Sequence, residues 1–386
     1  MEQKNSQTIS TTSSHDNNIL DLFGHYQFEN GSSQVLFLDV NQNEKGGTFL
    51  NHSLSFSVEN FVQTLASCNG LILFSGYSIE SIDQSCYYVF NPLTKQSTMI
   101  PQPCIQGYVV SVGLASNDDN NQFKIVLIEE NSSKLINGLE FHIFSSDDDT
   151  NKWNKVSHYI DLTLPSLPEI EFKELSIHPL YSNGSIHWEI GGYLLVYNVE
   201  KNNCELIELP NFFEDWSWQS TMTYRRCLCE SRGRVYYCYT DFDGFHIWEL
   251  LKKNHNLGLG PFYDSKKLRW KLVHSVMHEF FLSKHQVFCD TLFKWEPYKI
   301  APIAYSEKAQ TIYLQIPGAV VGYNFDTRNL RSICRYSYQD MNFSCCSFFS
   351  TFAFGTHNVL RGKDLVTNGE IMELNLPIGE IEKLSF

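Results

Sequence analysis

The cysteines that lie closest together along the chain are the first residues to test for chemistry. Two pairs stand out, Cys227 with Cys229 and the adjacent Cys345 and Cys346. A zinc site built from cysteines typically needs a Cys-X-X-Cys spacing with a second matched pair, and neither pair has that spacing. The eleven cysteines are scattered, and most lie within apolar stretches. We therefore expect buried, reduced thiols, no metal site and no cofactor.

Three histidines alternate with apolar residues within expected strands: His142, His187 and His246. If they met at a central channel beside tyrosines or aspartates, they could perform acid–base chemistry near neutral pH. We favour the alternative, in which each is a hydrogen-bonded strand residue. The carboxylates of Glu129 and Glu130 are interpreted as solvated charge in a turn. Phosphate-binding glycine loops, Gly-X-Ser-X-Gly and His-Glu-X-X-His are absent from the sequence.

One aromatic cluster follows no repeat of the chain and is the best candidate for a binding site. With the neighbouring acid, its members are Phe212, Phe213, Asp215, Trp216 and Trp218. Tryptophan is enriched in the hot spots of protein interfaces, and several exposed aromatic rings are costly without a partner. The competing interpretation is that these side chains pack at the rim of the fold.

A short phrase recurs along the chain, in which an apolar strand ends in an aromatic and then a polar residue. The polar residues are Asp39, Asn91, Ser145, Asn198, Glu249 and Asn324. Their spacings are 52, 54, 53, 51 and 75 residues. Self-similarity at such a period, built from short strands, is typical of β-propellers. We predict an all-β fold, a single β-propeller of six four-stranded blades, and the longest interval leaves room for a longer loop or a seventh blade.

The recurring aromatic residues are interpreted as packing between blades rather than as a ligand cage: Tyr88, Trp188, Tyr197, Trp248 and Tyr323. Tight turns such as Asn69-Gly70 and Asn183-Gly184 are strong hairpin signals. We expect short turns between first and second strands and between third and fourth strands. The other connections share the opposite face and are longer, at 76–85, 129–138, 158–172, 211–221 and 274–299. Long loops on one face of a rigid ring are where binding is expected.

The two ends of the chain have different predicted roles. Residues 1–22 form a polar tail that we expect to be disordered, and residues 23–386 form the propeller. Pairing of the N-terminal segment 34–40 with the C-terminal segment 348–354 is expected to close the ring, because a closed ring leaves no exposed sheet edge.

Composition excludes several classes of partner. The formal net charge is −14 and basic residues are not clustered, which argues against nucleic acids and anionic membranes. The first 18 residues are polar and lack the apolar core of a secretory signal. The longest apolar run, 343–354, is too short to span a bilayer. We expect a soluble protein of the cytoplasm or nucleus.

Several motifs resemble the F-box-associated domain of plant F-box proteins. Ser67-Cys68-Asn69-Gly70-Leu71-Ile72, with Asn91-Pro92-Leu93-Thr94-Lys95 and Ile100-Pro101, is similar to the "SCNGLL" strand and "NPxT(K/R)…LP" turn of that family. Gly184 to Trp188 and Ile247 to Leu250 resemble its later "HW" and "IWxL" units. The resemblance runs from about residue 34 to residue 354 and implies a kelch-like propeller.

The resemblance implies the substrate-recruiting half of a ubiquitin-ligase receptor. No F-box is visible ahead of the first strand, so binding of a Skp-type adaptor is in doubt. We therefore predict a protein-interaction propeller, more plausibly a binding module than an enzyme, with a protein partner on the long-loop face. The alternative is a propeller that binds or transforms a small molecule in a central polar pocket. A third possibility is a truncated product without activity.

Overall fold

The computed structural model describes seventeen stretches of the chain: 20–27, 33–39, 50–55, 60–78, 81–91, 96–117, 122–130, 139–148, 152–158, 179–190, 192–210, 226–241, 243–252, 269–284, 300–316, 319–335 and 350–355. Within these residues the chain is built of strands, with one α-helix, α2 (His278–Lys284). Within the same residues no helix is long and apolar enough to cross a membrane.

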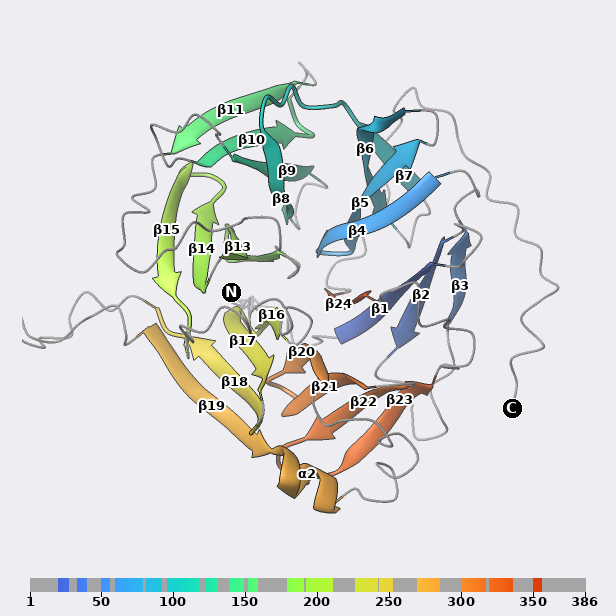
Figure 1. Ribbon diagram of the computed structural model, residues 1–386, viewed down its shortest axis with the longest axis vertical. Coiled ribbons are helices and arrows are strands. Elements are labelled where there is room, and N and C mark those ends of the chain that lie inside the picture. Colours follow the sequence, from blue (N-terminus) through green and yellow to red (C-terminus); the bar gives the residue numbers. More distant parts are fainter. Residues whose placement is uncertain are drawn as a thin grey trace, which may run out of the picture.

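Five blades are each made of four consecutive antiparallel strands (Figure 1). The first three of them contain β4 (Asn60–Cys68), β5 (Leu71–Ser78), β6 (Ser81–Asn91) and β7 (Gln96–Ile100); β8 (Tyr108–Asn117), β9 (Gln122–Glu130), β10 (Leu139–Ser145) and β11 (Trp153–His158); and β12 (Leu180–Ser182), β13 (Ser185–Ile190), β14 (Tyr193–Asn198) and β15 (Asn203–Glu208). The other two contain β16 (Arg226–Ser231), β17 (Arg234–Thr240), β18 (Gly244–Leu250) and β19 (Trp270–Met277); and β20 (Ala301–Ser306), β21 (Thr311–Ile316), β22 (Ala319–Asn324) and β23 (Leu330–Arg335).

A further four-stranded sheet combines the two ends of the described chain. Its order is β24-β1-β2-β3, from β24 (Ser350–Gly355), β1 (Leu20–Gln27), β2 (Ser33–Asp39) and β3 (Leu50–Ser55). The sheets lie in a ring around a common axis (Figure 1). The chain therefore folds as a single all-β propeller, as the repeat predicted.

The strand that joins the two ends differs from the expected one. The segment 34–40 was predicted to pair with the C-terminal strand, but β1 does so, with Leu20 opposite Gly355 and His25 opposite Ser350. β2, which contains most of the segment 34–40, does not contact β24 as a partner. It pairs with β1 instead, because β1 lies between β24 and β2 in the sheet. Residues 1–19 of the predicted tail lie outside the described residues.

The recurring polar residues mark the third strand of each sheet. Asp39, Asn91, Ser145, Asn198 and Asn324 are the last residues of β2, β6, β10, β14 and β22. Glu249 is the last but one residue of β18. The long final interval contains β19, α2, β20 and β21, and no additional sheet is found among its described residues. The expectation of a short turn between third and fourth strands is wrong at two places, since residues 40–49 separate β2 from β3 and residues 251–269 separate β18 from β19.

The hairpin turns follow from residues that tolerate positive φ. Asn69 and Gly70 have φ of 44° and 81°, and Asn183 and Gly184 have φ of 51° and 75°. Positive φ at both central residues is the geometry that fits the twist of a two-residue hairpin. The asparagine side chains also link neighbouring blades. Asn69 Nδ2 donates to the Ser116 carbonyl at 3.0 Å, and Asn183 Nδ2 donates to the Gly233 carbonyl at 2.9 Å.

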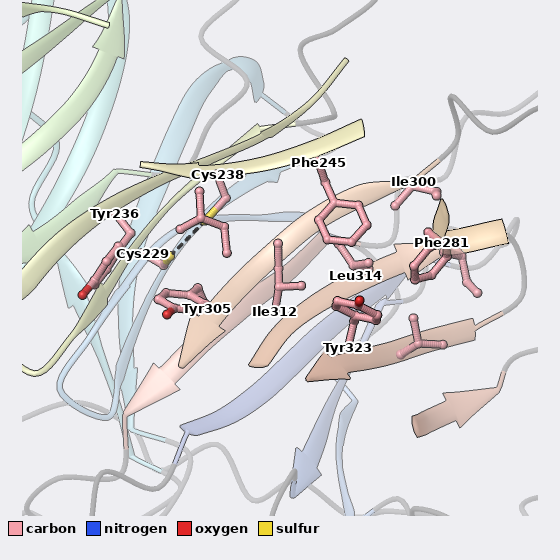
Figure 2. Packing of buried hydrophobic residues seen from close by; sticks show 13 residues of the cluster. Cys229, Tyr236, Cys238, Phe245, Phe281, Ile300, Tyr305, Ile312, Leu314 and Tyr323 are labelled. Carbon is pink, nitrogen blue, oxygen red and sulfur yellow. Dashed lines mark hydrogen bonds between the residues drawn. The ribbon is translucent and has the colours of Figure 1, made fainter. Parts of the chain in front are cut away.

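The apolar core lies between the blades. Phe141 of β10 stacks on Tyr197 of β14 with ring centroids 4.6 Å apart. Phe245 of β18 meets Tyr323 of β22 edge-on at 5.6 Å, within the large cluster of Figure 2. Trp188 is also fully buried. The prediction that Trp188, Tyr197 and Tyr323 pack the blades together is confirmed.

Candidate functional site

The connections between strands fall on two faces of the ring. Each blade has four antiparallel strands, so it begins and ends on the same face, which also carries the turn between its second and third strands. We call this the loop face. The connections at 131–138, 159–179, 211–225 and 285–299 begin and end on it. The strand order therefore places four of the five expected long connections on one face. The fifth, 76–85, is wrong, because β5 and β6 extend into it and only residues 79–80 separate them. The expected connection 274–299 is shorter than predicted, because residues 274–284 belong to β19 and α2.

The predicted aromatic cluster belongs to the connection from β15 to β16. Phe212, Phe213, Asp215, Trp216 and Trp218 lie outside the described residues. The structure describes the two ends of this connection. At the first end, the Leu209 N–H donates to the Gly192 carbonyl at 3.0 Å. Trp270 Nε1 of the next blade donates to the Glu208 carbonyl at 2.8 Å. The chain therefore leaves β15 from a fixed position.

A buried ion pair holds the other end of the same connection. Arg226, the first residue of β16, pairs through Nη1 with Glu189 Oε1 of β13 in the preceding blade. The side chains are 19% and 4% exposed. The Tyr237 side chain of β17 lies close enough to both partners to influence their pKa values. The pair thus links two blades directly under the loop face.

Electrostatics make this pair sensitive to the loss of either member. Burial raises the pKa of the Glu189 carboxyl, although Arg226 and Tyr237 act in the opposite direction. Burial lowers the pKa of Arg226, but the attraction of Glu189 outweighs this and the pKa is raised. An ionised carboxylate without its guanidinium partner would be left in an environment that disfavours its charge.

A second buried pair fixes the connection from β7 to β8. His142 Nε2 lies 2.5 Å from Glu129 Oε2, and both side chains are buried. Glu129 Oε1 also accepts hydrogen bonds from the backbone N–H groups of Gln106, at 2.7 Å, and of Gly107. Burial raises the pKa of Glu129, but the hydrogen bonds from Gly107, His142 and Gln106 together lower it below its usual value.

The interpretation of Glu129 as a solvated turn residue is therefore wrong. It is 2% exposed as the last but one residue of β9, because the following connection starts two residues later than the sequence suggested. Glu129, Glu140 and His142 lie close enough to hold a metal ion. However, Glu129 already accepts three hydrogen bonds, and Glu140 pairs with Lys155. The carboxylate and imidazole groups that could bind a metal ion are therefore already engaged in these hydrogen bonds and this ion pair.

The turn between β17 and β18 carries a Ser–His–Asp chain of hydrogen bonds. Ser275 Oγ lies 3.0 Å from His246 Nδ1, and His246 Nε2 lies 3.2 Å from Asp241 Oδ1. The same carboxylate oxygen accepts from the backbone N–H groups of Asp243 and Gly244. Its bonds close the turn on itself, so we interpret the chain as a turn-stabilising network.

Histidines do not converge on a common site. His142, His187 and His246 belong to three different blades and to second or third strands. His187 is buried with Nδ1 3.2 Å from the Leu180 carbonyl, and burial lowers its pKa to about 4. Each histidine has its own partners, which confirms the interpretation as hydrogen-bonded strand residues. They therefore give no support to acid–base catalysis in a central channel.

A family model now accounts for this arrangement. The model described as "F-box protein At3g26010-like, beta-propeller" matches residues 42–352. The chain belongs to this family. The F-box protein resemblance inferred from the "SCNGLL" and "NPxT" motifs is thereby confirmed at the level of the family.

Two curated relatives of this F-box-type propeller come from Arabidopsis thaliana. Putative F-box protein At5g50220 is 23% identical over 148 residues, which is 38% of this chain and 36% of the relative. F-box protein At5g07610 is 21% identical over 289 residues, which is 70% of this chain and 63% of the relative. The chain therefore spans less than two thirds of the length of each. Among solved structures, apo AztD from Citrobacter koseri is 11% identical with a TM-score of 0.41, covering 89% of this chain and 100% of that one.

Sequence reasoning missed the charged groups that support the loop face of this family member. Glu189 and Arg226 are 37 residues apart (226 − 189), and neither carries a motif. Their pairing depends on two blades meeting side by side. A second missed group is a set of three thiols from Cys227, Cys229 and Cys238. The sequence offered the first two as a pair, but Cys238 comes from the adjacent strand.

Proposed function

We propose that this propeller is a protein-interaction module that binds a protein partner on its loop face. We further propose that it acts as the substrate-recognition part of a plant F-box ubiquitin-ligase receptor. The observation that carries the proposal is the anchoring of the 211–225 connection at both ends, by Leu209 to Gly192 and by Arg226 to Glu189. A connection that starts and ends at fixed points loses less freedom when it binds a partner than one with mobile ends.

Membership of an F-box protein family supports the ligase part of this proposal. The aromatic side chains within 211–218 support a protein as the ligand, because Trp in particular is enriched where binding energy concentrates. The net charge of −14 favours a protein partner over nucleic acid.

We also propose that the blades form a closed ring of six. We further propose that the protein acts in the cytoplasm or nucleus. Pairing of β24 with β1 supports closure, since it joins strands from the two ends of the described chain in one sheet. The seven cysteines whose side chains the structure describes carry free thiols, which supports a reducing compartment. Fluorescent fusions of the full chain in plant cells test the location, and a secretory distribution would contradict it.

The binding proposal is tested by affinity capture from plant cells with the tagged full chain. We compare the wild type with the double variant Trp216→Ala/Trp218→Ala after chemical crosslinking and mass spectrometry. Met99→Ala is the control, since Met99 is 63% exposed on β7, the outermost strand of a blade that does not adjoin the 211–225 connection. We expect partners that the control retains and the double variant loses. Identical partner lists from all three proteins would refute binding through this connection.

The ligase role needs a separate measurement. Purified full-length chain is incubated with recombinant plant Skp adaptors, with an F-box protein of the same family as positive control. Adaptor binding is the expected result if the chain works in a ligase. Partner capture without adaptor binding would reject the ligase role while keeping the interaction role.

A further inference from the structure

Three thiols gather on one face of the β16–β19 blade. In the antiparallel pair of β16 and β17, Cys227 is directly opposite Cys238. Cys229 is two residues along β16 from Cys227, so its side chain leaves the strand on the same face. Neighbours on one face of an antiparallel pair are close enough to interact. The three side chains are therefore brought together by strand register rather than by a sequence motif.

The distances fit a single small ion. The three sulfur atoms all lie within 4.8 Å of one another. Cys229 Sγ and Cys238 Sγ are 3.7 Å apart, the contact drawn as a dashed line in Figure 2. With metal–sulfur bonds of about 2.3 Å, three sulfurs arranged around one ion are about 4.0 Å apart. The observed spacing therefore requires little movement of the two strands.

Apolar groups surround the thiols at the boundary with the next blade. Cys229 and Cys238 are buried in the same cluster as Phe245, Tyr305 and Ile312. Cys227 is partly exposed and lies on β16, the strand of its blade nearest the centre of the ring (Figure 1). An ion can therefore reach the sulfurs from the side of Cys227 while the other two remain covered.

A thiol must lose its proton before its sulfur binds a metal ion, so the protons of the three thiols pass to the solvent as the ion binds.

The donor set selects the kind of ion. Within the described residues the cluster contains sulfur alone, with no histidine or carboxylate among its members. Structural zinc sites are almost always four-coordinate, whereas soft thiolates also favour Cu(I). A monovalent ion also reduces the charge that bound metal adds to an apolar interface, where charge is costly.

We propose that Cys227, Cys229 and Cys238 form a three-sulfur binding site for Cu(I). The ion replaces thiol protons, which pass to solvent, and no electron is transferred. Bound Cu(I) would tie β16 to β17 and so stiffen the blade that follows the 211–225 connection. This proposal goes beyond the proposed protein-binding function and does not depend on it.

Anaerobic titration of the purified full chain with Cu(I), in competition with a chromophoric Cu(I) chelator, tests the site. We expect a single tight equivalent, near-ultraviolet sulfur-to-copper charge transfer, and X-ray absorption with copper bound only by sulfur. Cys229→Ala and Cys227→Ser are expected to lose this equivalent. Cys227→Ser guards against misfolding, because Cys227 is the partly exposed member. Cys104→Ser is the control, since Cys104 is exposed and outside the cluster.

Two results would overturn the proposal. One is Cu(I) binding that Cys229→Ala and Cys227→Ser leave intact while Cys104→Ser removes it. The other is a preference for Zn(II) over Cu(I) at this cluster, with nitrogen or oxygen in the coordination shell, because the site would then not be a three-sulfur site. Loss of the equivalent in a variant that keeps the wild-type circular dichroism supports the site directly.

Discussion

Removal of Arg226 provides the sharpest test of how the loop face is supported. In Arg226→Met the long apolar stem is largely kept, but the guanidinium that pairs with Glu189 is lost. Breaking a buried pair by removing one partner typically costs about 3–5 kcal/mol. Because the Arg226 side chain is 19% exposed and partly solvated, we expect the lower end of that range, about 3 kcal/mol.

The control for this variant lies in the same blade. Arg234 of β17 pairs with Glu249 and Glu307, but its side chain is 51% exposed. Exposed pairs contribute about 0–1 kcal/mol, so Arg234→Met is expected to change stability little. Adding Glu189→Gln to Arg226→Met removes the uncompensated charge and is expected to recover most of the loss. The comparison of single and double variants isolates the interaction between the two side chains.

The loss in Arg226→Met also depends on pH. Burial raises the pKa of Glu189 in the folded protein above its ordinary value of 4.5, and without Arg226 the opposing attraction is gone. A group with a raised folded pKa binds more protons in the folded state, so stability falls as pH rises through that pKa. The variant should therefore come closer to the wild type at about pH 5 than at about pH 8.

Urea unfolding followed by tryptophan fluorescence measures the unfolding free energies of the variants and the wild type. Hydrogen exchange of β13 and β16 measures the local loss of stability without assuming two-state unfolding. The reasoning is refuted if Arg226→Met costs no more than Arg234→Met. A deficit that does not shrink toward acid pH would also contradict it, because the buried charge of Glu189 would then not be the cause.

Two further variants test the electrostatics of the β12–β15 blade and its packing against the β8–β11 blade. The folded pKa of His187 is about 4 against an ordinary value of 6.5, so stability should fall as pH drops through this window, by about 3 kcal/mol at most. In His187→Gln, whose amide can still donate to the Leu180 carbonyl, urea unfolding between these pH values should lose that part of the dependence, and an unchanged profile would contradict the assignment. In Gly113→Ala the new Cβ would lie 2.7 Å from Trp188 Cζ2 and 2.8 Å from Ile186 Cγ2, which is overpacking expected to cost about 1–3 kcal/mol. Thermal unfolding measures this cost, and a variant as stable as the wild type would show that the two blades can separate to admit a methyl group.

Features that depend on the period of the chain could be predicted from the sequence. Asn91, Asn198 and Asn324 recur because each ends the third strand of its blade, where a polar residue starts the following turn. Asn69 and Asn183 identify hairpins because their neighbours are glycines and both residues adopt positive φ. Such signals are local, and the repeat reinforces them.

Features that depend on contact between strands could not be predicted in the same way. Cys238 joins Cys227 because of the register of two strands, and Arg226 meets Glu189 because two blades are adjacent. Glu129 looked like a turn residue because it precedes Glu130 and a polar segment, yet hydrogen bonds from another connection bury it. A test of spacing along the chain cannot find groups that register and blade contact assemble.

The two faces of the ring are joined by different chemistry, and this difference bears on binding. The face with tight turns uses a neutral amide link from Asn183 to the Gly233 carbonyl and an exposed ion pair between Arg234 and Glu307. Under the loop face, the buried charges of Glu189 and Arg226 hold the end of the 211–225 connection. A buried ion pair contributes little net stability compared with an apolar pair of similar volume. Separating its two members is costly, so conformations in which Arg226 does not reach Glu189 are strongly disfavoured. That penalty fixes where the connection returns to the blade, and a fixed return point confines the entropy lost on binding to the connection itself.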